Sequence, residues 1–348
     1  MPNERPALLV VGPSWIGDMV MAQSLFKTLK LQQPERSIDV SAPAWSVPLL
    51  SRMPEVTQNI PLHVSHGELA LKKRYQSGKT LRGKYQQAIV LPRSLKASLL
   101  PFFAKIPMRT GFTGEQRYGL INDRRPFDPV LLDQTVKRFV ALGLTSADAQ
   151  QPFNIPYPEL TIDTVNQANV INRLRLNPNL PTVALLPGAE YGPAKQWPLE
   201  YYANLAKTMQ NHGYQVIILG SEKDRPVGAE IAKNSERTIR NLCGKTRIID
   251  VIDLLNFCHV AVANDSGLMH VASAVNCPVV AIYGSSTPKF TPPLTEKTAI
   301  AHLNLSCSPC FKRQCPLKHL HCLRHIRPDH IEQMVFNLLQ PTEKPMKK

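Results

Sequence analysis

The strongest constraint on the fold is a pattern of strand, loop and helix that occurs twice. An apolar run at 8–12 ends in Gly12 and precedes a helical pattern that places Met21, Leu25 and Leu29 on one face. About 175 residues later, an apolar run at 182–186 leads through a glycine-containing loop to an amphipathic stretch at 199–211. The repeat predicts two halves with the same α/β organisation.

Other short apolar runs are typical of strands and alternate with helical stretches. They lie at 38–42, 87–91, 215–219, 260–263 and 278–283. We therefore predict an α/β fold made of two Rossmann-like, doubly wound parallel-sheet domains. A length of 348 residues also suits two domains.

The segment at 150–180 is rich in proline and has weak periodicity, which favours a connection between domains. We place an N-terminal domain at 1–170 and a C-terminal domain at 171–348. The second domain includes a cysteine-rich segment at 307–322. It ends in an amphipathic helix at 328–340, where Ile331, Val335 and Leu338 share one face.

Positive charge is concentrated in one part of the chain. The formal net charge is +15, and the segment 72–125 holds thirteen lysines and arginines but only Glu115 and Asp123 as acidic residues. An acidic partner is expected, and charge alone leaves nucleic acid, an anionic membrane and a phosphorylated substrate open. A solvated surface is the structural alternative.

No apolar run approaches the ~18 residues of a membrane span, and the first residues lack a signal-peptide pattern. Cys243, Cys258 and Cys277 lie in apolar surroundings, as expected for reduced thiols. We expect a cytoplasmic protein.

Two familiar nucleotide motifs are incomplete. Gly12 and Gly17 do not form the G-x-G-x-x-G fingerprint of nicotinamide-dependent dehydrogenases. Gly244 begins a Gly-Lys-Thr triplet, but position 239, where a phosphate-binding loop needs glycine, is Ile239.

The clearest local motif is NDSGLMH at 264–270, where an apolar strand gives way to polar residues and a new helix. The free N–H groups at Ser266 and Gly267 favour an anion such as a diphosphate, and His270 lies one turn further on. The structural alternative is that Asp265 and Ser266 only cap the helix.

Two more candidates follow strands of the second half. Lys195 lies in the loop after 182–186, where it could supply a cation to a phosphate, unless the loop is an ordinary proline-rich connection. Glu222 follows the strand at 215–219 and could bind ribose hydroxyls.

Asp18 begins the first helix directly after a strand end. It is either a helix-dipole partner or a general base that removes a proton from a sugar hydroxyl. Asp265 is the second candidate for the base.

Four cysteines, Cys307, Cys310, Cys315 and Cys322, fall within sixteen residues. Four thiolates suit a structural Zn²⁺ site. An iron–sulfur cluster or free thiols remain alternatives.

Seven stretches in this order resemble glycosyltransferase family 9, the ADP-heptose:lipopolysaccharide heptosyltransferases. They are GPSWIGDM at 12–19, APAW at 42–45, LLSRMP at 49–54, RTGF at 109–112, RYGLIND at 117–123, PGAEYGPAKQWP at 187–198 and NDSGLMH at 264–270. The resemblance implies a GT-B fold, whose two domains face a cleft, with the acceptor held by the first and ADP-heptose by the second.

The resemblance also implies roles for individual residues. Asp18 corresponds to the catalytic base, Lys195 to a diphosphate ligand and Glu222 to a ribose ligand. Contacts to the sugar and diphosphate are implied for Asp265, Ser266, Gly267 and His270. The implied reaction is inverting and needs no cofactor, and we find no Asp-x-Asp motif that would hold a catalytic metal.

The implied acceptor is the phosphorylated or acidic inner core of lipopolysaccharide, heptosyl-Kdo2-lipid A, which gives the basic segment a partner. Its candidate contacts are Arg93, Lys96, Arg109 and Arg117. Peripheral contact with the cytoplasmic face of the inner membrane is expected, and no nucleic acid. Two alternatives are another GT-B enzyme, such as a nucleotide-sugar epimerase, and a nucleic-acid-binding protein with a zinc knuckle, although no nucleic-acid-binding module is recognisable.

Overall fold

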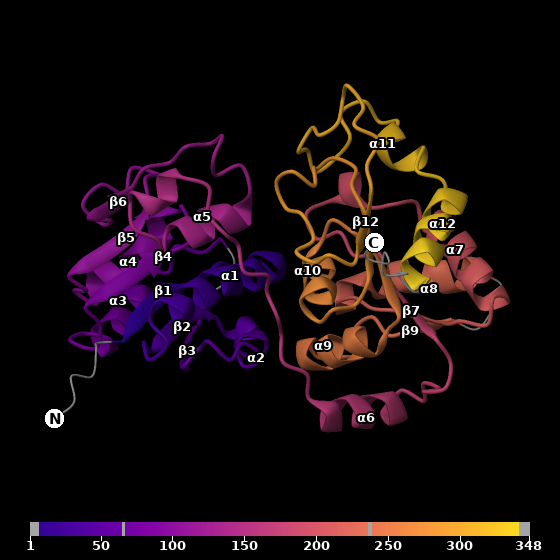
Figure 1. The fold of residues 1–348 in the computed structure, drawn as a ribbon, viewed down its shortest axis with the longest axis horizontal. Coiled ribbons are helices and arrows are strands. Elements are labelled where there is room, and N and C mark those ends of the chain that lie inside the picture. Colours follow the sequence, from indigo (N-terminus) through magenta and orange to yellow (C-terminus); the bar gives the residue numbers. More distant parts are fainter. Residues whose placement is uncertain (1–6, 65–66, 236–238, 341–348) are drawn as a thin grey trace, which may run out of the picture. The chain divides into compact units, whose positions relative to one another are not determined.

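A computed structural model describes residues 7–64, 67–235 and 239–340. The chain divides into two compact units, Met1–Thr161 and Ile162–Lys348, each with its own sheet (Figure 1). None of the helices in the described ranges is long and apolar enough to cross a bilayer.

The first unit contains a six-stranded sheet and its helices. The strands are β1 (Leu8–Val11), β2 (Ile38–Pro43), β3 (Gln58–Leu62), β4 (Gln87–Val90), β5 (Met108–Phe112) and β6 (Asp123–Arg125). The helices are α1 (Ile16–Gln32), α2 (Val47–Leu50), α3 (Leu71–Thr80), α4 (Leu95–Phe103) and α5 (Thr135–Ala141), with 3₁₀ turns at Ala44–Ser46 and Asp148–Gln150.

The second unit also contains a six-stranded sheet. Its strands are β7 (Thr182–Leu186), β8 (Gln215–Ile218), β9 (Arg240–Asn241), β10 (Val260–Asn264), β11 (Val279–Ile282) and β12 (Thr298–Ala301). Its helices are α6 (Thr164–Arg173), α7 (Leu199–Asn211), α8 (Arg225–Asn234), α9 (Ile248–Phe257), α10 (Gly267–Ala274), α11 (His321–Arg324) and α12 (Pro328–Leu339), with 3₁₀ turns at Pro193–Lys195 and Glu222–Asp224.

Both sheets have the same topology. The strand order is β3-β2-β1-β4-β5-β6 in the first and, read from the other end, β9-β8-β7-β10-β11-β12 in the second. Neighbouring strands are parallel throughout, for example Val10 opposite Val40 on one side and Ile89 on the other. This is the doubly wound Rossmann order, so the predicted α/β fold of two such domains is confirmed.

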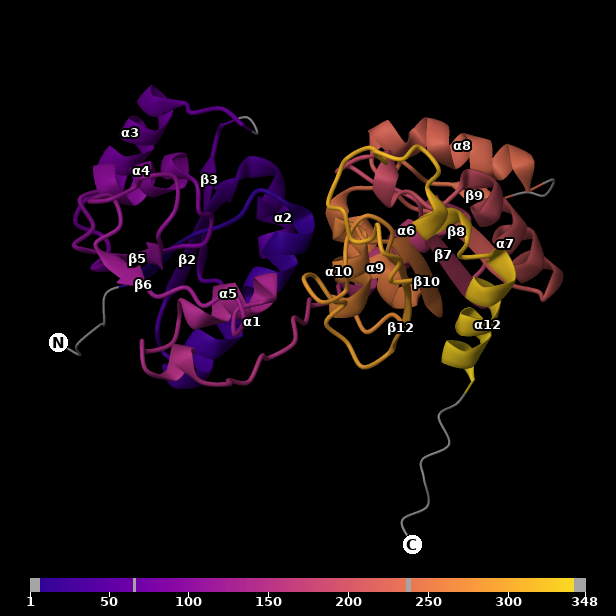
Figure 2. The ribbon, with the colours of Figure 1, turned by 90° about the horizontal axis from the view of Figure 1, so that it is seen from above.

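The central strands are apolar along their whole length because helices cover both faces of a parallel sheet. In the first unit, α3 and α4 pack together on one face and α1 and α5 on the other (Figure 2). Every residue of β1 and β7 is buried. In the second unit, α12 packs on α7 and adds Ile331 and Val335 to the core.

The boundary between the units lies nearer the N-terminus than the predicted division after residue 170. The reason is α6, a helix that the proline-rich composition did not predict. Asp163 caps it by accepting a hydrogen bond from the backbone N–H of Asn166, at 2.9 Å. Its last residue, Arg173, pairs with the buried Asp250 of α9 at 2.9 Å, which fixes α6 to the second unit.

The strand order gives each sheet a switch point, between β1 and β4 and between β7 and β10. The connections leave the strands in opposite directions there, and ligands of such folds bind beyond the carboxyl ends. Asp18 follows β1, Lys195 follows β7, and Asp265 follows β10. The sheet order therefore brings these candidates to the expected places.

Candidate functional site

The centre of the candidate site in the second unit is an ion pair. Lys195 ends the 3₁₀ turn after β7, and its Nζ lies 2.5 Å from Oδ2 of Asp265, the residue after β10. The lysine side chain is 18% exposed and the aspartate side chain 5%. Oδ1 of Asp265 accepts a hydrogen bond from Oγ1 of Thr291, at 3.3 Å. Two residues far apart in sequence thus form one ion pair at the switch point.

Asn264 connects the two loops that carry this pair. Its Oδ1 accepts hydrogen bonds from the backbone N–H of Trp197 and the hydroxyl of Tyr202, both at 3.0 Å. Its Nδ2 donates to the carbonyl of Pro187, at 2.8 Å. The side chain is fully buried. Asn264 was not among the residues predicted for the site; the signal for it in the sequence is an amide side chain at the end of an apolar strand, where burial requires hydrogen-bond partners.

The beginning of α10 supplies backbone donors. Ser266 is its N-cap residue, in extended conformation and without a side-chain capping bond, and Gly267 is its first residue. Both are half-buried. A helix of eight residues leaves its first N–H groups without partners inside the helix, which favours an anion. Asp265 pairs with Lys195, so the simple capping interpretation does not account for this motif.

His270 lies in α10 and is only 4% exposed. Its pKa is lowered from 6.5 to about 4, mainly by burial; the Asp265 carboxylate opposes this shift, and the Lys195 cation adds to it. Its Nδ1 has no hydrogen-bond partner within the described part of the chain. The imidazole is therefore neutral near pH 7, and its Nδ1 can form a hydrogen bond with a ligand.

Glu222 is the first residue of the 3₁₀ turn after β8 and is exposed. Arg225 donates to its Oε1, at 3.1 Å. Gly244 faces this carboxylate with a φ of +72°, and a side chain there would collide with Glu222 Oε2. The glycine that resembles part of a phosphate-binding loop is therefore needed for turn geometry beside Glu222.

Asp18 belongs to the first turn of α1, which begins at Ile16 with Trp15 as N-cap residue. The carboxylate is half-buried and lies beyond the carboxyl end of β1. This is the place that a general base would need, at the switch point of the first sheet. Its role stays a prediction.

Two of the four predicted acceptor contacts remain open to a ligand. Arg93 and Lys96 follow β4 at the carboxyl edge. Arg93 is exposed, stacks its guanidinium 4.7 Å from the ring of Phe127 and donates to the carbonyl of Thr113. Lys96 forms no hydrogen bond or ion pair with any described residue and is half-buried. Both remain available to a phosphate.

Arg109 and Arg117 instead stabilise the protein. Arg109 is near the start of β5, at the opposite edge, and donates to the carbonyls of Ile106, Leu120 and Gly119. Arg117 is 2% exposed and donates to the carbonyls of Phe112 and Pro92 and to Ser98 Oγ. Burial, together with the Arg93 cation, lowers the pKa of Arg117 to about 10. Every nitrogen of both guanidinium groups donates to a protein carbonyl, so we exclude both arginines from the proposed acceptor contacts.

The four clustered cysteines line one small cavity of about 20 Å³, with His319. Burial and the neighbouring Cys307, Cys315 and Cys310 raise the pKa of Cys322 to about 11. Burial of Cys315 tends to raise its pKa, but backbone N–H groups at 317–320 donate to its sulfur and lower it. All four thiols are free, and no three His, Cys, Asp or Glu side chains of the described ranges surround a common point as metal ligands. The zinc site stays a proposal.

The cysteine-rich segment contacts the loop that carries Lys195. The backbone N–H of Ala194 donates to the carbonyl of Arg313, at 3.1 Å, and Tyr191 Oη donates to that of Phe311, at 2.8 Å. A side chain at Gly192 would collide with Arg313. The segment therefore helps to set the conformation of the lysine loop.

Comparison with known proteins identifies the family. The model of glycosyltransferase family 9 (heptosyltransferase) matches residues 74–321. The chain belongs to glycosyltransferase family 9. Lipopolysaccharide heptosyltransferase 2 of Salmonella typhimurium is 44% identical over 95% of this chain and 98% of its own length. The Escherichia coli protein of that name is 47% identical over 85% of this chain and 88% of its own.

A solved structure of this family agrees with the fold. The structure of E. coli ADP-heptose lps heptosyltransferase II has a TM-score of 0.85 and 41% identity, covering 96% of this chain and 98% of that one. Membership in family 9, together with these relatives, makes the chain a heptosyl glycosyltransferase.

Proposed function

We propose that this enzyme transfers L-glycero-D-manno-heptose from ADP-heptose to the first heptose of heptosyl-Kdo2-lipid A, in lipopolysaccharide core biosynthesis. The names of its close relatives support this donor and acceptor class. The observation that carries the proposal is the Lys195–Asp265 pair beside the beginning of α10, at the switch point of the second sheet.

The donor would bind to the second unit. Its diphosphate fits the N–H groups at Ser266 and Gly267, and Lys195 can contribute its cation. His270, neutral and with an unpartnered Nδ1, can contact the sugar or diphosphate. Glu222 is exposed beyond β8 and can accept hydrogen bonds from ribose hydroxyls.

In the proposed reaction, Asp18 accepts the proton of the acceptor hydroxyl, whose oxygen attacks the anomeric carbon of heptose. The bond from that carbon to the diphosphate oxygen breaks, ADP leaves with the electron pair, and the anomeric configuration inverts. Lys195 and the N-terminus of α10 balance the charge that develops on ADP. We propose that no cofactor is required for this step.

The acceptor would bind to the first unit. Arg93 and Lys96, at the carboxyl edge that carries Asp18, are the proposed contacts to its phosphates or acidic sugars. Because lipid A is anchored in a membrane, we also propose that the enzyme acts peripherally at the cytoplasmic face of the inner membrane.

ADP release from ADP-heptose and heptosylated Kdo2-lipid A tests the reaction. We expect the wild type to release ADP and Asp18→Asn to be slower by ~10²–10⁴-fold, because loss of a general base costs this much. Asp329→Asn is the matched control, because Asp329 is also in the first turn of a helix, α12, but is not among the proposed site residues. No ADP release by the wild type would refute the donor and acceptor; an active Asp18→Asn would transfer the role of base to Asp265.

A further inference from the structure

One exposed face of the first unit combines cations with apolar side chains. Helix α3 runs from the carboxyl edge of the sheet, after β3, to the amino edge, before β4, and packs beside α4 (Figures 1 and 2). We call its outer surface, with the end of α4, the α3 face. Its exposed members are Leu69, Leu71, Lys72, Lys73, Tyr75, Lys79, Arg82, Lys84, Phe102 and Lys105.

Helix α3 divides into a packed side and an open side. Gly78 approaches Phe103 of α4 so closely that a Cβ would lie 2.6 Å from Phe103 Cβ, and Arg74 is buried. On the open side, Leu71 and Tyr75 are one turn apart and 52% and 43% exposed. An apolar stripe bordered by lysines is typical of helices that lie at a membrane surface.

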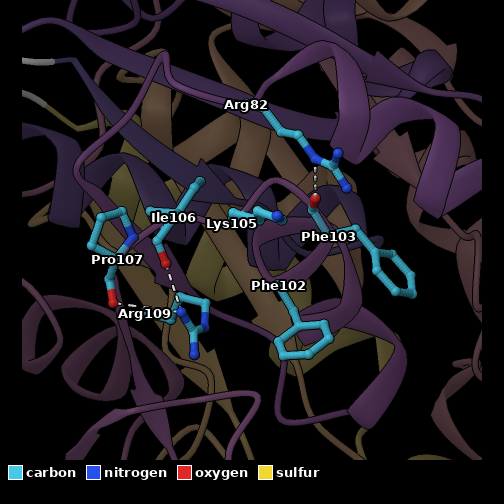
Figure 3. Close-up of a pocket in the computed structure, with 7 residues that line it drawn as sticks. All are labelled: Arg82, Phe102, Phe103, Lys105, Ile106, Pro107 and Arg109. Atoms are coloured by element: carbon cyan, nitrogen blue, oxygen red, sulfur yellow. Dashed lines mark hydrogen bonds between the residues drawn. The ribbon is translucent and has the colours of Figure 1, made fainter.

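The α3 face contains a pocket at the amino edge of the sheet, near the C-terminal ends of α3 and α4. An open pocket of about 400 Å³ is lined by Arg82, Phe102, Phe103, Lys105, Ile106, Pro107 and Arg109 (Figure 3). Arg82 Nε donates to the carbonyl of Phe103 at 3.1 Å, which holds its cation at the rim beside the aromatic rings. The pocket adjoins the start of β5, at the edge opposite Asp18. It therefore cannot be where the reacting hydroxyl binds.

We propose that the α3 face docks on an anionic phospholipid surface, with the lysines and Arg82 against lipid phosphates and Leu71, Tyr75 and Phe102 at the level of the headgroups. The inference deepens the proposed function, on which it rests for a lipid-anchored acceptor. Charge complementarity supports this occupant, because the only acidic residue of the described part of segment 68–84 is Glu68, which lies 3.8 Å from Lys73.

The direction of α3 fits this role. Its ten residues extend over ~15 Å between the two edges of the sheet. A flat surface that contacts the whole helix would lie along one face of the sheet and would leave the carboxyl edge, with Asp18, open beside it. An acceptor anchored in the same bilayer could then reach that edge.

Vesicle co-sedimentation tests the docking surface. The full-length protein is mixed with phosphatidylcholine vesicles, or with the same vesicles containing phosphatidylglycerol, without donor or acceptor. We expect binding to the anionic vesicles only, weakened by salt. The double variant Lys72→Glu, Lys79→Glu should bind at least ~25-fold more weakly, since each cation near an anionic surface contributes about fivefold.

Two further variants make the test specific. Lys233→Glu, Lys297→Glu changes the charge equally at exposed lysines of the second unit and should bind like the wild type. Leu71→Ser keeps every cation and should bind ~10-fold more weakly, because it removes an apolar anchor. Equal binding by the two double variants, or equal wild-type binding to both vesicles, would overturn the proposal. Since no substrate is present, either result leaves the proposed reaction standing.

Discussion

His270 is a histidine whose environment keeps it uncharged. In the folded protein its pKa is about 4, whereas an exposed histidine has a value near 6.5, and burial is the main cause. As pH falls through this interval, the unfolded chain takes up a proton that the folded protein does not. The folded state therefore loses stability on acidification.

This predicts a specific pH dependence. At about pH 5, His270 should lower the free energy of unfolding by ~2 kcal/mol relative to neutral pH, because each pKa unit corresponds to ~1.4 kcal/mol. His270→Gln, which cannot be protonated, should reduce the slope between pH 7 and 5 in urea unfolding. His330→Gln, at an exposed histidine of α12, is the control and should keep the wild-type slope. A wild-type slope in His270→Gln would contradict the prediction.

The buried Lys195–Asp265 ion pair can be compared with an exposed ion pair of the same unit. Lys195→Met should reduce kcat/KM for the donor by ~10–100-fold, because a charge-assisted hydrogen bond contributes ~1.5–3 kcal/mol. Lys223, in the same unit, pairs with Glu190 at 2.8 Å, but its side chain is 77% exposed. Lys223→Met should leave donor kinetics nearly unchanged, as exposed pairs contribute little. Initial rates at varied ADP-heptose measure both; equal effects would argue against a donor role for Lys195.

Residue types predicted which side chains could have a function, but only the fold showed which residues they contact. Asp265 and Lys195 are 70 positions apart in sequence, so no local pattern indicates their contact. The four arginine and lysine candidates show the same limit: charge predicts a basic surface, but only the carbonyls around Arg109 and Arg117 show that these two guanidinium groups are structural.

At the scale of elements, the cysteine-rich segment has little regular secondary structure and contacts the loop that carries Lys195. We propose that Cys307, Cys310, Cys315 and Cys322 hold a structural Zn²⁺ after small side-chain movements. The shared cavity and the backbone N–H groups around the Cys315 sulfur support this, since such donors stabilise a thiolate. A metal would fix the segment whose backbone contacts Tyr191 and Ala194, next to Lys195.

Metal analysis of protein purified under reducing conditions should find about one equivalent of zinc, because four thiolates complete tetrahedral coordination. Cys315→Ser should lose the metal and raise the KM for the donor, since the lysine loop loses support. Cys277→Ser, at a buried cysteine outside the cluster, should retain the metal. Absence of metal from the wild type would end the proposal, and visible absorption would indicate an iron–sulfur cluster instead.

The sequence predicted the apolar central strands and the amphipathic helices well, but it predicted the strands at the edges of the sheets poorly. Strand β7 and helix α7 occupy the expected residues, because buried strands and amphipathic helices leave clear patterns. Strand β9 has only two residues, Arg240–Asn241, and pairs through its backbone, so its side chains carry no strand signal. Helix α6 lies between proline-rich stretches, so the composition of the segment did not predict it, and Asp163 caps its first turn.

For the whole molecule, the excess of positive charge should affect the rate of encounter with an acidic acceptor. Raising salt from about 0.05 to 0.3 M shortens the screening length to well below 10 Å and should reduce kcat/KM for a phosphorylated acceptor severalfold. A dephosphorylated acceptor is the comparison and should show a weaker salt dependence. Identical salt dependence of the two acceptors would argue against electrostatic steering.

The two sheets share one strand order, and each has its own switch point and its own hydrophobic core. A chain built in this way can vary as two nearly independent modules. On the binding roles proposed above, substitutions around Lys195 and Asp265 would alter which activated sugar is used, while substitutions around Asp18, Arg93 and Lys96 would alter which sugar receives it. Exchange of one module between relatives is therefore a direct route to enzymes with new combinations of donor and acceptor.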